Sequence, residues 1–179
     1  MFFCIDFEST GSANGQEPLE FAWVGLTMDG EFLKPHEIGF ENVKGGRDLN
    51  FETTYPHLRD AWPLIEKNLQ NQVLVGHNIN YDHSLLVKTF PGFKAAGLID
   101  TLTLYRQLYD KQIDDYSLTS LMSVFQLGHK IDEYVCNDHF EPHRAMYDSY
   151  SCGLLLQRLL LDEQTRSIFT KQESQGELF

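Results

Sequence analysis

The chain opens with Met1-Phe2-Phe3-Cys4-Ile5-Asp6-Phe7-Glu8, an apolar run that becomes acidic at its end and continues into Ser9-Thr10-Gly11. A short apolar run of this kind predicts a buried strand over residues 1–6. Because strand side chains alternate between two faces, the carboxylates of Asp6 and Glu8 point the same way. Keeping both carboxylates charged beside a buried strand is costly. A bound Mg²⁺ or Mn²⁺, which prefers oxygen ligands, would stabilise them. A lone Asp-x-Glu is more often a solvent-facing strand end, so the rest of the chain must decide.

Length and composition limit the classes of protein. The 179 residues suffice for one domain, and the 42% hydrophobic and 22% charged residues are ordinary for a globular protein. We expect a cytoplasmic location, because the N-terminus lacks the features of a secretory signal and no stretch could span a bilayer. Cys4, Cys136 and Cys152 are widely spaced, which favours reduced thiols over a disulfide framework.

The net charge is −12, from 14 basic and 26 acidic residues. This excess of acid argues against tight binding to long duplex nucleic acid, which depends on neutralising phosphates. An enzyme that grips only a short end can bind weakly if another protein delivers it. The charge therefore predicts recruitment by a partner.

The hydrophobic pattern predicts an α/β fold, with three antiparallel strands first and then alternating strands and helices. The strands are expected at 1–6, 19–27, 30–34, 72–76 and 95–99. The helices are expected at 55–71, 81–90, 101–109, 117–125 and 144–161. Met28-Asp29-Gly30 supplies a hairpin turn between the second and third strands. We expect one domain over 1–161, followed by a polar tail over 162–179.

A second polar cluster, Gly76-His77-Asn78 with Asp82, follows the predicted strand at 72–76. Connections between a buried strand and a helix are where open sheets bind ligands. Asp82 is also typical of a residue that caps a helix, and Asn78 of a loop residue in an unusual backbone conformation. His77 could support a site or pack beneath the loop, and Asp100 is expected to be structural.

A third cluster, His143-Arg144-Ala145-Met146-Tyr147-Asp148, lies at the start of the last predicted helix. Residues about one helical turn apart approach a common site, so His143 and Asp148 can act together. An imidazole beside a metal-bound carboxylate suits general-base catalysis, because it ordinarily titrates near neutrality. Taken separately, His143 reads as an exposed loop residue and Asp148 as a surface acid.

Together these three motifs resemble those of the DEDDh exonucleases, a family that includes bacterial proofreading subunits, ribonuclease T and oligoribonuclease. The resemblance covers about residues 2–160, with Asp6-Phe7-Glu8, Asp82 and His143 to Asp148 in matching order. It implies a ribonuclease H-like fold: a mixed five-stranded sheet of three antiparallel and two parallel strands, flanked by helices.

The resemblance also implies hydrolysis of phosphodiesters with two divalent cations, Mg²⁺ or Mn²⁺. Asp6, Glu8 and Asp148 correspond to the ligands of one ion, and Asp6 and Asp82 to those of the second. His143 corresponds to the base that takes the proton of the attacking water. The catalytic set is therefore expected to be Asp6, Glu8, Asp82, His143 and Asp148.

Substrate contacts are implied at two places. The backbone of the first loop is expected against the terminal nucleotide, flanked by Asn78 and Tyr81, because an aromatic ring gives any base a stacking surface. Core packing is an equally good interpretation of Tyr81. The expected substrate-binding residues are Ser9, Thr10, Gly11, Asn78 and Tyr81.

A competing metal site uses Cys136, His139 and His143, whose Cys-x2-His-x3-His spacing is compatible with zinc. No fourth ligand stands at a regular spacing from these three. Zinc resistant to chelators in the purified protein would support this site and would remove His143 from catalysis.

The last residues, Gln175-Gly176-Glu177-Leu178-Phe179, resemble the Gln-x-x-Leu-Phe peptide by which bacterial replication proteins bind the sliding clamp. Two large apolar residues in a polar tail are anchors for a pocket on a partner. Packing of Leu178 and Phe179 onto their own domain is the alternative. The expected partner-binding residues are thus Gln175, Leu178 and Phe179. Binding to the clamp would provide the recruitment by a partner that the net charge predicts.

The leading hypothesis is a 3′-to-5′ exonuclease that shortens single-stranded or frayed DNA and releases nucleoside 5′-monophosphates, in proofreading or repair. The same catalytic set would serve an exoribonuclease or oligoribonuclease. A module that binds nucleic-acid ends or partners without cleaving is the third hypothesis, and the intact set from Asp6 to Asp148 argues against it.

Overall fold

The computed structural model describes residues 1–9, 18–32, 42–44, 58–131, 143–163 and 165–166. The strands are β1 (Phe2–Ser9), β2 (Pro18–Leu26), β3 (Asn42–Lys44), β4 (Val73–Gly76) and β5 (Gly97–Asp100). The helices are α2 (Trp62–Leu69), α3 (Ile79–Thr89), α4 (Thr101–Leu108), α5 (Leu118–Val124), α6 (Gly128–Ile131) and α7 (Ala145–Leu161). The predicted domain boundary coincides with the end of α7, and the division of the chain there stays a prediction.

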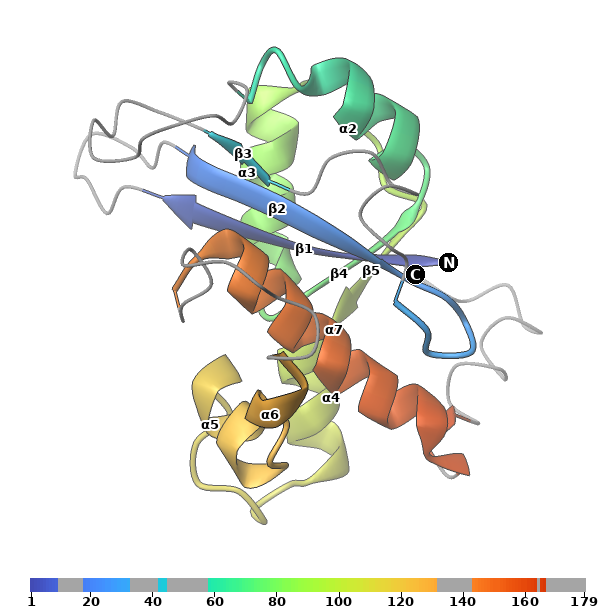
Figure 1. Cartoon of the computed structure of the whole chain (residues 1–179), viewed down its shortest axis with the longest axis vertical. Coiled ribbons are helices and arrows are strands. Elements are labelled where there is room, and N and C mark those ends of the chain that lie inside the picture. The colour runs from blue at the N-terminus through green and yellow to red at the C-terminus, as the bar shows by residue number, and fades with distance from the viewer. Residues whose placement is uncertain (10–17, 33–41, 45–57, 132–142, 164, 167–179) are drawn as a thin grey trace.

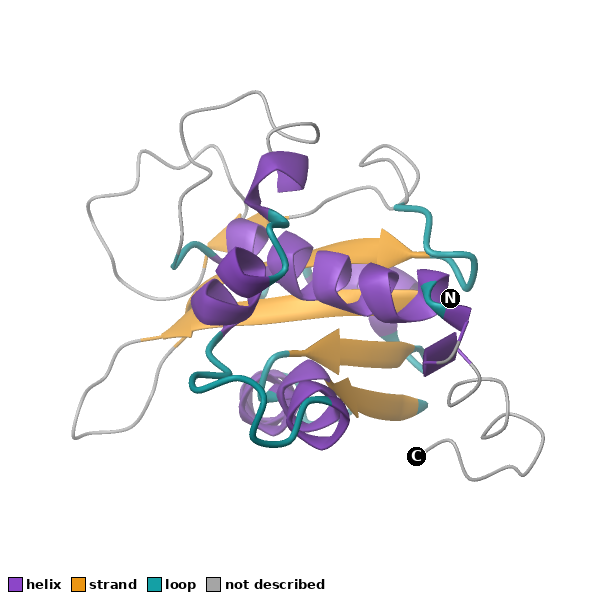
Figure 2. Ribbon diagram, turned by 90° about the horizontal axis from the view of Figure 1, so that it is seen from below, coloured by secondary structure: helices purple, strands orange, loops and turns teal. Residues whose placement is uncertain are grey.

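One mixed sheet joins the strands in the order β3-β2-β1-β4-β5 (Figures 1 and 2). β2 runs antiparallel to β1 and the short β3 antiparallel to β2, whereas β4 is parallel to β1 and β5 to β4. The predicted α/β class is confirmed, with antiparallel pairing in the first part of the chain and parallel pairing in the second. β1 lies at the centre of the sheet.

The third strand lies elsewhere than predicted. Residues 30–34 were expected to pair with β2, but among the described residues there only Phe32 does so, in an isolated bridge to Leu26. The Phe32 ring instead packs on α7, with its centroid 5.4 Å from that of Tyr150. A Cβ on Gly153 would lie 2.6 Å from this ring, so the glycine admits the close approach. Phe32 thus keeps a single bridge to the last residue of β2, and β3 pairs with Glu20 to Ala22 nearer the start of that strand.

Two hydrophobic clusters fill the two faces of the sheet. On β1, Phe2 and Cys4 belong to the cluster that contains α7, whereas Phe3, Ile5 and Phe7 belong to the cluster that contains α2 and α3. This alternation is the period-two pattern of a strand buried on both faces. Continued along β1, it puts the next two even-numbered residues, both acidic, on the face covered by α7.

The helices agree with the prediction except at two places. The helix expected over 55–71 begins at Trp62 within the described residues, and Pro63 stands in its first turn. Proline is tolerated there because the first amides of a helix have no partner within the helix. The four-residue α6 was not predicted, because one turn is too short to establish a periodic pattern.

Candidate metal centre

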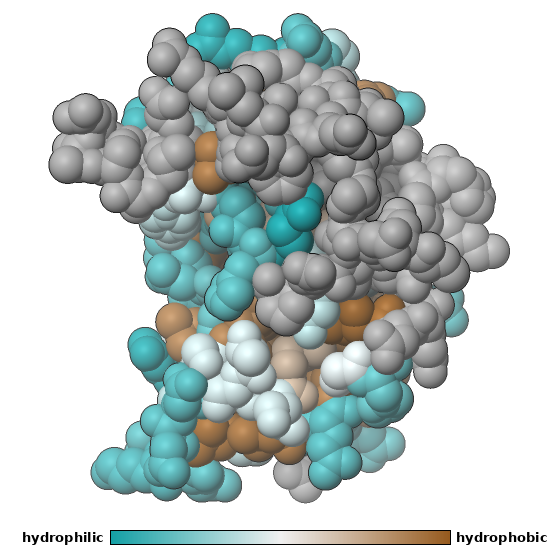
Figure 3. Space-filling view, turned by 60° about the vertical axis from the view of Figure 1, so that its left-hand side comes forward, coloured by the Kyte–Doolittle hydropathy of each residue, from teal (hydrophilic) through white to brown (hydrophobic). Residues whose placement is uncertain are grey.

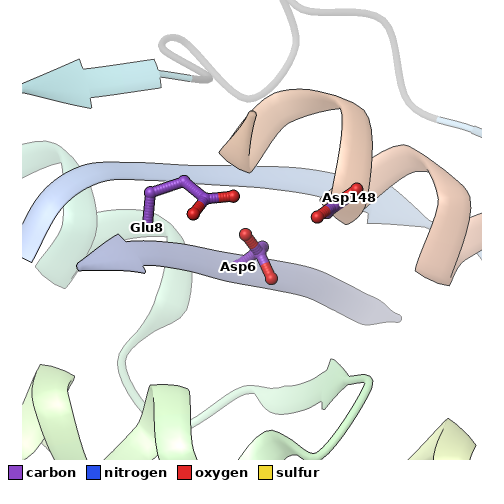
Figure 4. A group of neighbouring side chains, drawn as sticks. All are labelled: Asp6, Glu8 and Asp148. Carbon is purple, nitrogen blue, oxygen red and sulfur yellow. The ribbon is translucent and has the colours of Figure 1, made fainter. Parts of the chain in front are cut away.

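Three carboxylates converge between β1 and α7 (Figure 4). Asp6 and Glu8 point from β1 toward Asp148 in the first turn of α7, and one oxygen from each lies within 4.8 Å of the others. Opposite ligands of an octahedral Mg²⁺ lie about 4.2 Å apart, and those of larger hard cations about 5 Å apart. The three oxygens are therefore near enough to share one hard divalent cation once side-chain rotation shortens the longer separations.

The electrostatics of the three carboxylates favour a cation between them. Burial, followed by the charges of Asp82, Asp148 and Glu8, holds the pKa of Asp6 well above its usual range. Burial and the charges of Asp148 and Glu20 raise the pKa of Glu8 to about 7. Burial also raises the pKa of Asp148. Charged together without a counter-ion, these groups repel one another in a poorly solvated place, and a bound cation would relieve that repulsion.

Asp82, on α3, is not one of the three carboxylates within 4.8 Å of one another, but its charge acts on Asp6. It is buried in the first turn of that helix, and its Oδ1 accepts a hydrogen bond of 2.9 Å from the backbone amide of Phe7. Pairing of β1 with β4 ends at Cys4 and Val75, so the amide of Phe7 lies beyond the reach of that strand. Burial raises the pKa of Asp82 to about 7, although the hydrogen bond from Phe7 opposes the shift.

Asn78 holds the N-cap position of α3, so Asp82 is not the N-cap residue. Asp82 does stand in the first turn of that helix and accepts a hydrogen bond from its own amide, as the helix-start interpretation expected. Asn78 adopts the left-handed conformation with φ of 74°, which confirms the unusual backbone considered for it. Its amide donates to Asp100 Oδ1 over 2.9 Å, and the same oxygen accepts from the amide of Leu102 at the start of α4. Asp100 is therefore structural, as predicted.

The ring of His77 connects the loop after β4 to α4 and to the segment before α5. Its Nε2 lies 2.8 Å from the carbonyl oxygen of Tyr116, and its Nδ1 lies 3.1 Å from the hydroxyl of Thr101. Burial lowers the pKa of His77, so the neutral ring is favoured. Of its two interpretations, packing beneath the loop describes these contacts.

Tyr81 packs against the core, as one of its two interpretations expected, and the substrate role stays a prediction. Its ring is half-buried against the cluster of α2 and α3, and its hydroxyl is hydrogen-bonded to that of Ser9 at the end of β1. The structure thus brings two expected substrate-binding residues together at the end of the strand that carries the acids. Thr10 and Gly11 lie outside the described residues.

His143 is exposed and stands two residues before α7, with a positive φ of 66°. Burial raises the pKa of Glu8 and Asp148, and the electrostatic interaction of each with His143 opposes that rise. For Asp148, a backbone hydrogen bond with His143 opposes it as well. The imidazole therefore stands at the rim of the acidic cluster. Figure 3 looks onto the side where β1 ends, and hydrophilic residues gather at the middle of that face.

Several predicted residues lie outside the described part of the chain. They are the zinc candidates Cys136 and His139 and the partner-binding residues Gln175, Leu178 and Phe179. The zinc site and the clamp-binding peptide both stay predictions.

Sequence reasoning did not identify Glu20 and Arg144, which form an ion pair of 2.9 Å beside the site. Glu20 pairs with Glu8 across β1 and β2, and only 6% of its surface is exposed. A glutamate next to the apolar run Phe21-Ala22-Trp23-Val24 was the available signal, because a charge in a buried strand needs a partner.

Comparison with protein-family models gives no match, and a search of curated proteins finds no matching relative. In the described part of the chain, no helix has both the length and the apolar character of a membrane span.

Proposed function

We propose that this chain is a divalent-metal-dependent 3′-to-5′ exonuclease of the DEDDh type, with a ribonuclease H-like fold. The convergence of Asp6, Glu8 and Asp148 within 4.8 Å is the observation that carries the proposal. A strand end and a helix start, far apart in the chain, supply these oxygens, and an exposed histidine stands beside them. The order of the motifs and the strand directions of the sheet add support.

Asp6, Glu8 and Asp148 would hold one cation, and Asp6 with Asp82 a second. Bound cations would supply charge neutralisation and Lewis acidity at the phosphodiester. The raised pKa values of Asp6, Glu8 and Asp82 support this assignment. Burial and mutual repulsion disfavour the charged carboxylates there, and bound cations would offset both effects.

The protein's own residues would orient the end of the strand and move the proton. A ring nitrogen of His143 accepts the proton of the attacking water, for which its exposed place at the rim of the acids is suited. Ser9 and Tyr81, joined by their hydroxyls, lie where a terminal nucleotide would meet the end of β1. Hydrolysis there releases a nucleoside 5′-monophosphate.

The preferred substrate is a single-stranded or frayed DNA end in the cytoplasm. The clamp-like peptide Gln175-Gly176-Glu177-Leu178-Phe179 favours DNA over RNA, because sliding clamps act on DNA. Delivery by a clamp also fits the net charge of −12, which makes unaided binding to a polyanion weak.

The test uses DNA and RNA oligonucleotides labelled at the 5′ or the 3′ end, incubated with Mg²⁺, Mn²⁺ or EDTA. We expect metal-dependent shortening of DNA from the 3′ end, its loss in Asp6→Asn, and normal activity in the control Asp114→Asn, which removes an exposed acid between α4 and α5. Shortening of RNA alone would make the protein an exoribonuclease. Binding of nucleic-acid ends without cleavage would make the protein a binding module. Absence of metal-dependent shortening would refute the proposal that it is an enzyme.

A further inference from the structure

Helix α7 is held at its N-terminus by a residue of another element. The N-cap residue Arg144 makes no side-chain cap, and the carboxylate of Glu20 on β2 takes that place. Its Oε2 accepts from Arg144 Nε over 2.9 Å and from the amide of Ala145 over 3.4 Å, and its Oε1 accepts from Arg144 Nη2 over 3.3 Å. The side chains of Glu20 and Arg144 are 7% and 19% exposed. The pair is thus a largely buried fork that fixes where α7 begins.

A second contact fixes the next turn of α7. The buried hydroxyl of Ser149 donates to the carbonyl oxygen of Ala22 over 3.2 Å. In the β1–β2 ladder, Ala22 is the partner of Asp6, and Glu20 is the partner of Glu8. The two positions of β2 that hold α7 are therefore the ones opposite the two acids of β1.

Asp148 lies between these two contacts along α7. Its carboxylate reaches Asp6 and Glu8 only if the first turn of the helix keeps its place over the sheet. Both ends of that turn are tied to β2, one by Glu20 and Arg144 and the other by Ser149. The strand that pairs with β1 thus also sets the distance from the acids of β1 to the acid of α7.

We infer that Glu20 and Arg144 are positioning residues. They hold the carboxylate of Asp148 near enough to those of Asp6 and Glu8 to share one cation, and they thereby set the affinity of the site for divalent cations. This inference rests on the metal site of the proposed function and adds the residues that assemble it. Substitution of a partner that orients a metal ligand typically lowers metal affinity roughly 10-fold to 100-fold.

Glu20 is itself an acid beside the site, so its role as a further ligand is the alternative. Both of its carboxylate oxygens are already engaged by donors, Oε2 by two of them. A cation could bind Glu20 only by displacing the guanidinium of Arg144, with which it shares a bidentate pair. The charge of Glu20 is therefore used to anchor the helix.

The experiment titrates Mn²⁺ into the full chain without nucleic acid and follows free Mn²⁺ by electron paramagnetic resonance. Glu20→Gln keeps an acceptor but removes the charge, and Arg144→Lys keeps the charge but removes the fork. The control Arg166→Lys makes the same change in an exposed ion pair of 3.2 Å with Asp29, beyond the other end of α7. Circular dichroism establishes that each variant is folded.

We expect Glu20→Gln and Arg144→Lys to weaken Mn²⁺ binding roughly 10-fold to 100-fold, while Arg166→Lys binds as the wild type does. A general loss of stability would not produce this result in variants that are folded and saturate at higher Mn²⁺. Wild-type affinity in both folded variants overturns the inference. If Glu20→Gln does not fold, Arg144→Lys decides by the same criterion.

The wild-type titration separates this inference from the proposed function. A wild type that binds no Mn²⁺ refutes the metal site and the positioning role together. A wild type that binds Mn²⁺ more tightly than the variants, yet shortens no oligonucleotide, supports the positioning role and refutes the exonuclease.

Discussion

The backbone amide of Phe7 donates a hydrogen bond of 2.9 Å to the carboxylate of Asp82, which lies 75 residues further along the chain. Phe7 stands between Asp6 and Glu8 in β1. This bond therefore attaches α3 to the strand between the two acids. One oxygen of Asp82 therefore holds the backbone, and the charge of the group adds to burial in raising the pKa of Asp6.

The two roles of Asp82 can be separated by substitution. Asp82→Asn keeps an oxygen for the amide of Phe7 and removes a charge that burial opposes, so the metal-free protein should be at least as stable as the wild type. Asp82→Ala leaves that amide without its partner and should lower the free energy of unfolding by about 1–3 kcal/mol. Urea unfolding in EDTA measures both, and equal stabilities of the two variants would contradict the role of the hydrogen bond. Metal-dependent cleavage should fall in both variants.

The acids predict a pH dependence of stability in the absence of metal. The pKa of Glu8 is raised from 4.5 to about 7 on folding, so the folded state binds more protons than the unfolded state between those values. The stability that the protonated carboxyl of Glu8 contributes is therefore fully present below the lower of these pKa values. It is lost as the pH rises through the higher one. Glu8→Gln removes this titration, so in EDTA its melting temperature relative to the wild type should rise between about pH 5 and about pH 8. A difference that does not change with pH would contradict the prediction, and saturating Mn²⁺ should reduce the dependence in the wild type.

His143 should matter for the rate and not for assembly of the site. Asparagine tolerates the left-handed backbone that His143 adopts, so His143→Asn should fold normally. Loss of the general base should lower kcat roughly 10²-fold to 10⁴-fold, with little change in Mn²⁺ affinity. The matched control is His129→Asn, which changes an exposed histidine of α6. Full activity of His143→Asn would show that another group accepts the proton.

The sequence also predicts binding to a sliding clamp. A peptide with residues 170–179 should bind a bacterial clamp, and Phe179→Ala should abolish binding because it removes an apolar anchor. Glu177→Ala changes a position that the motif leaves open and should bind normally. Fluorescence anisotropy of the labelled peptide measures both, and absence of binding at micromolar clamp would refute the motif.

Local patterns were sufficient where an element depends on its own residues. Alternation along β1 placed Asp6 and Glu8 on one face, and the last predicted helix placed Asp148 one turn after His143. They were insufficient for the strand expected at 30–34, because Phe32 packs on α7, more than 100 residues further along the chain. The fork between Glu20 and Arg144 joins residues 124 positions apart, which no local period records.

The sequence by itself determined which chemical groups stand together on each element: two acids on one strand face, an acid in the first turn of α3, and a histidine and an acid at the start of α7. Strand and helix periodicity requires only neighbouring residues, so these could be predicted. Only the tertiary structure decided how far apart the groups lie, because their distances depend on contacts between elements. The amide of Phe7 holds Asp82, and β2 holds α7 at the positions opposite Asp6 and Glu8.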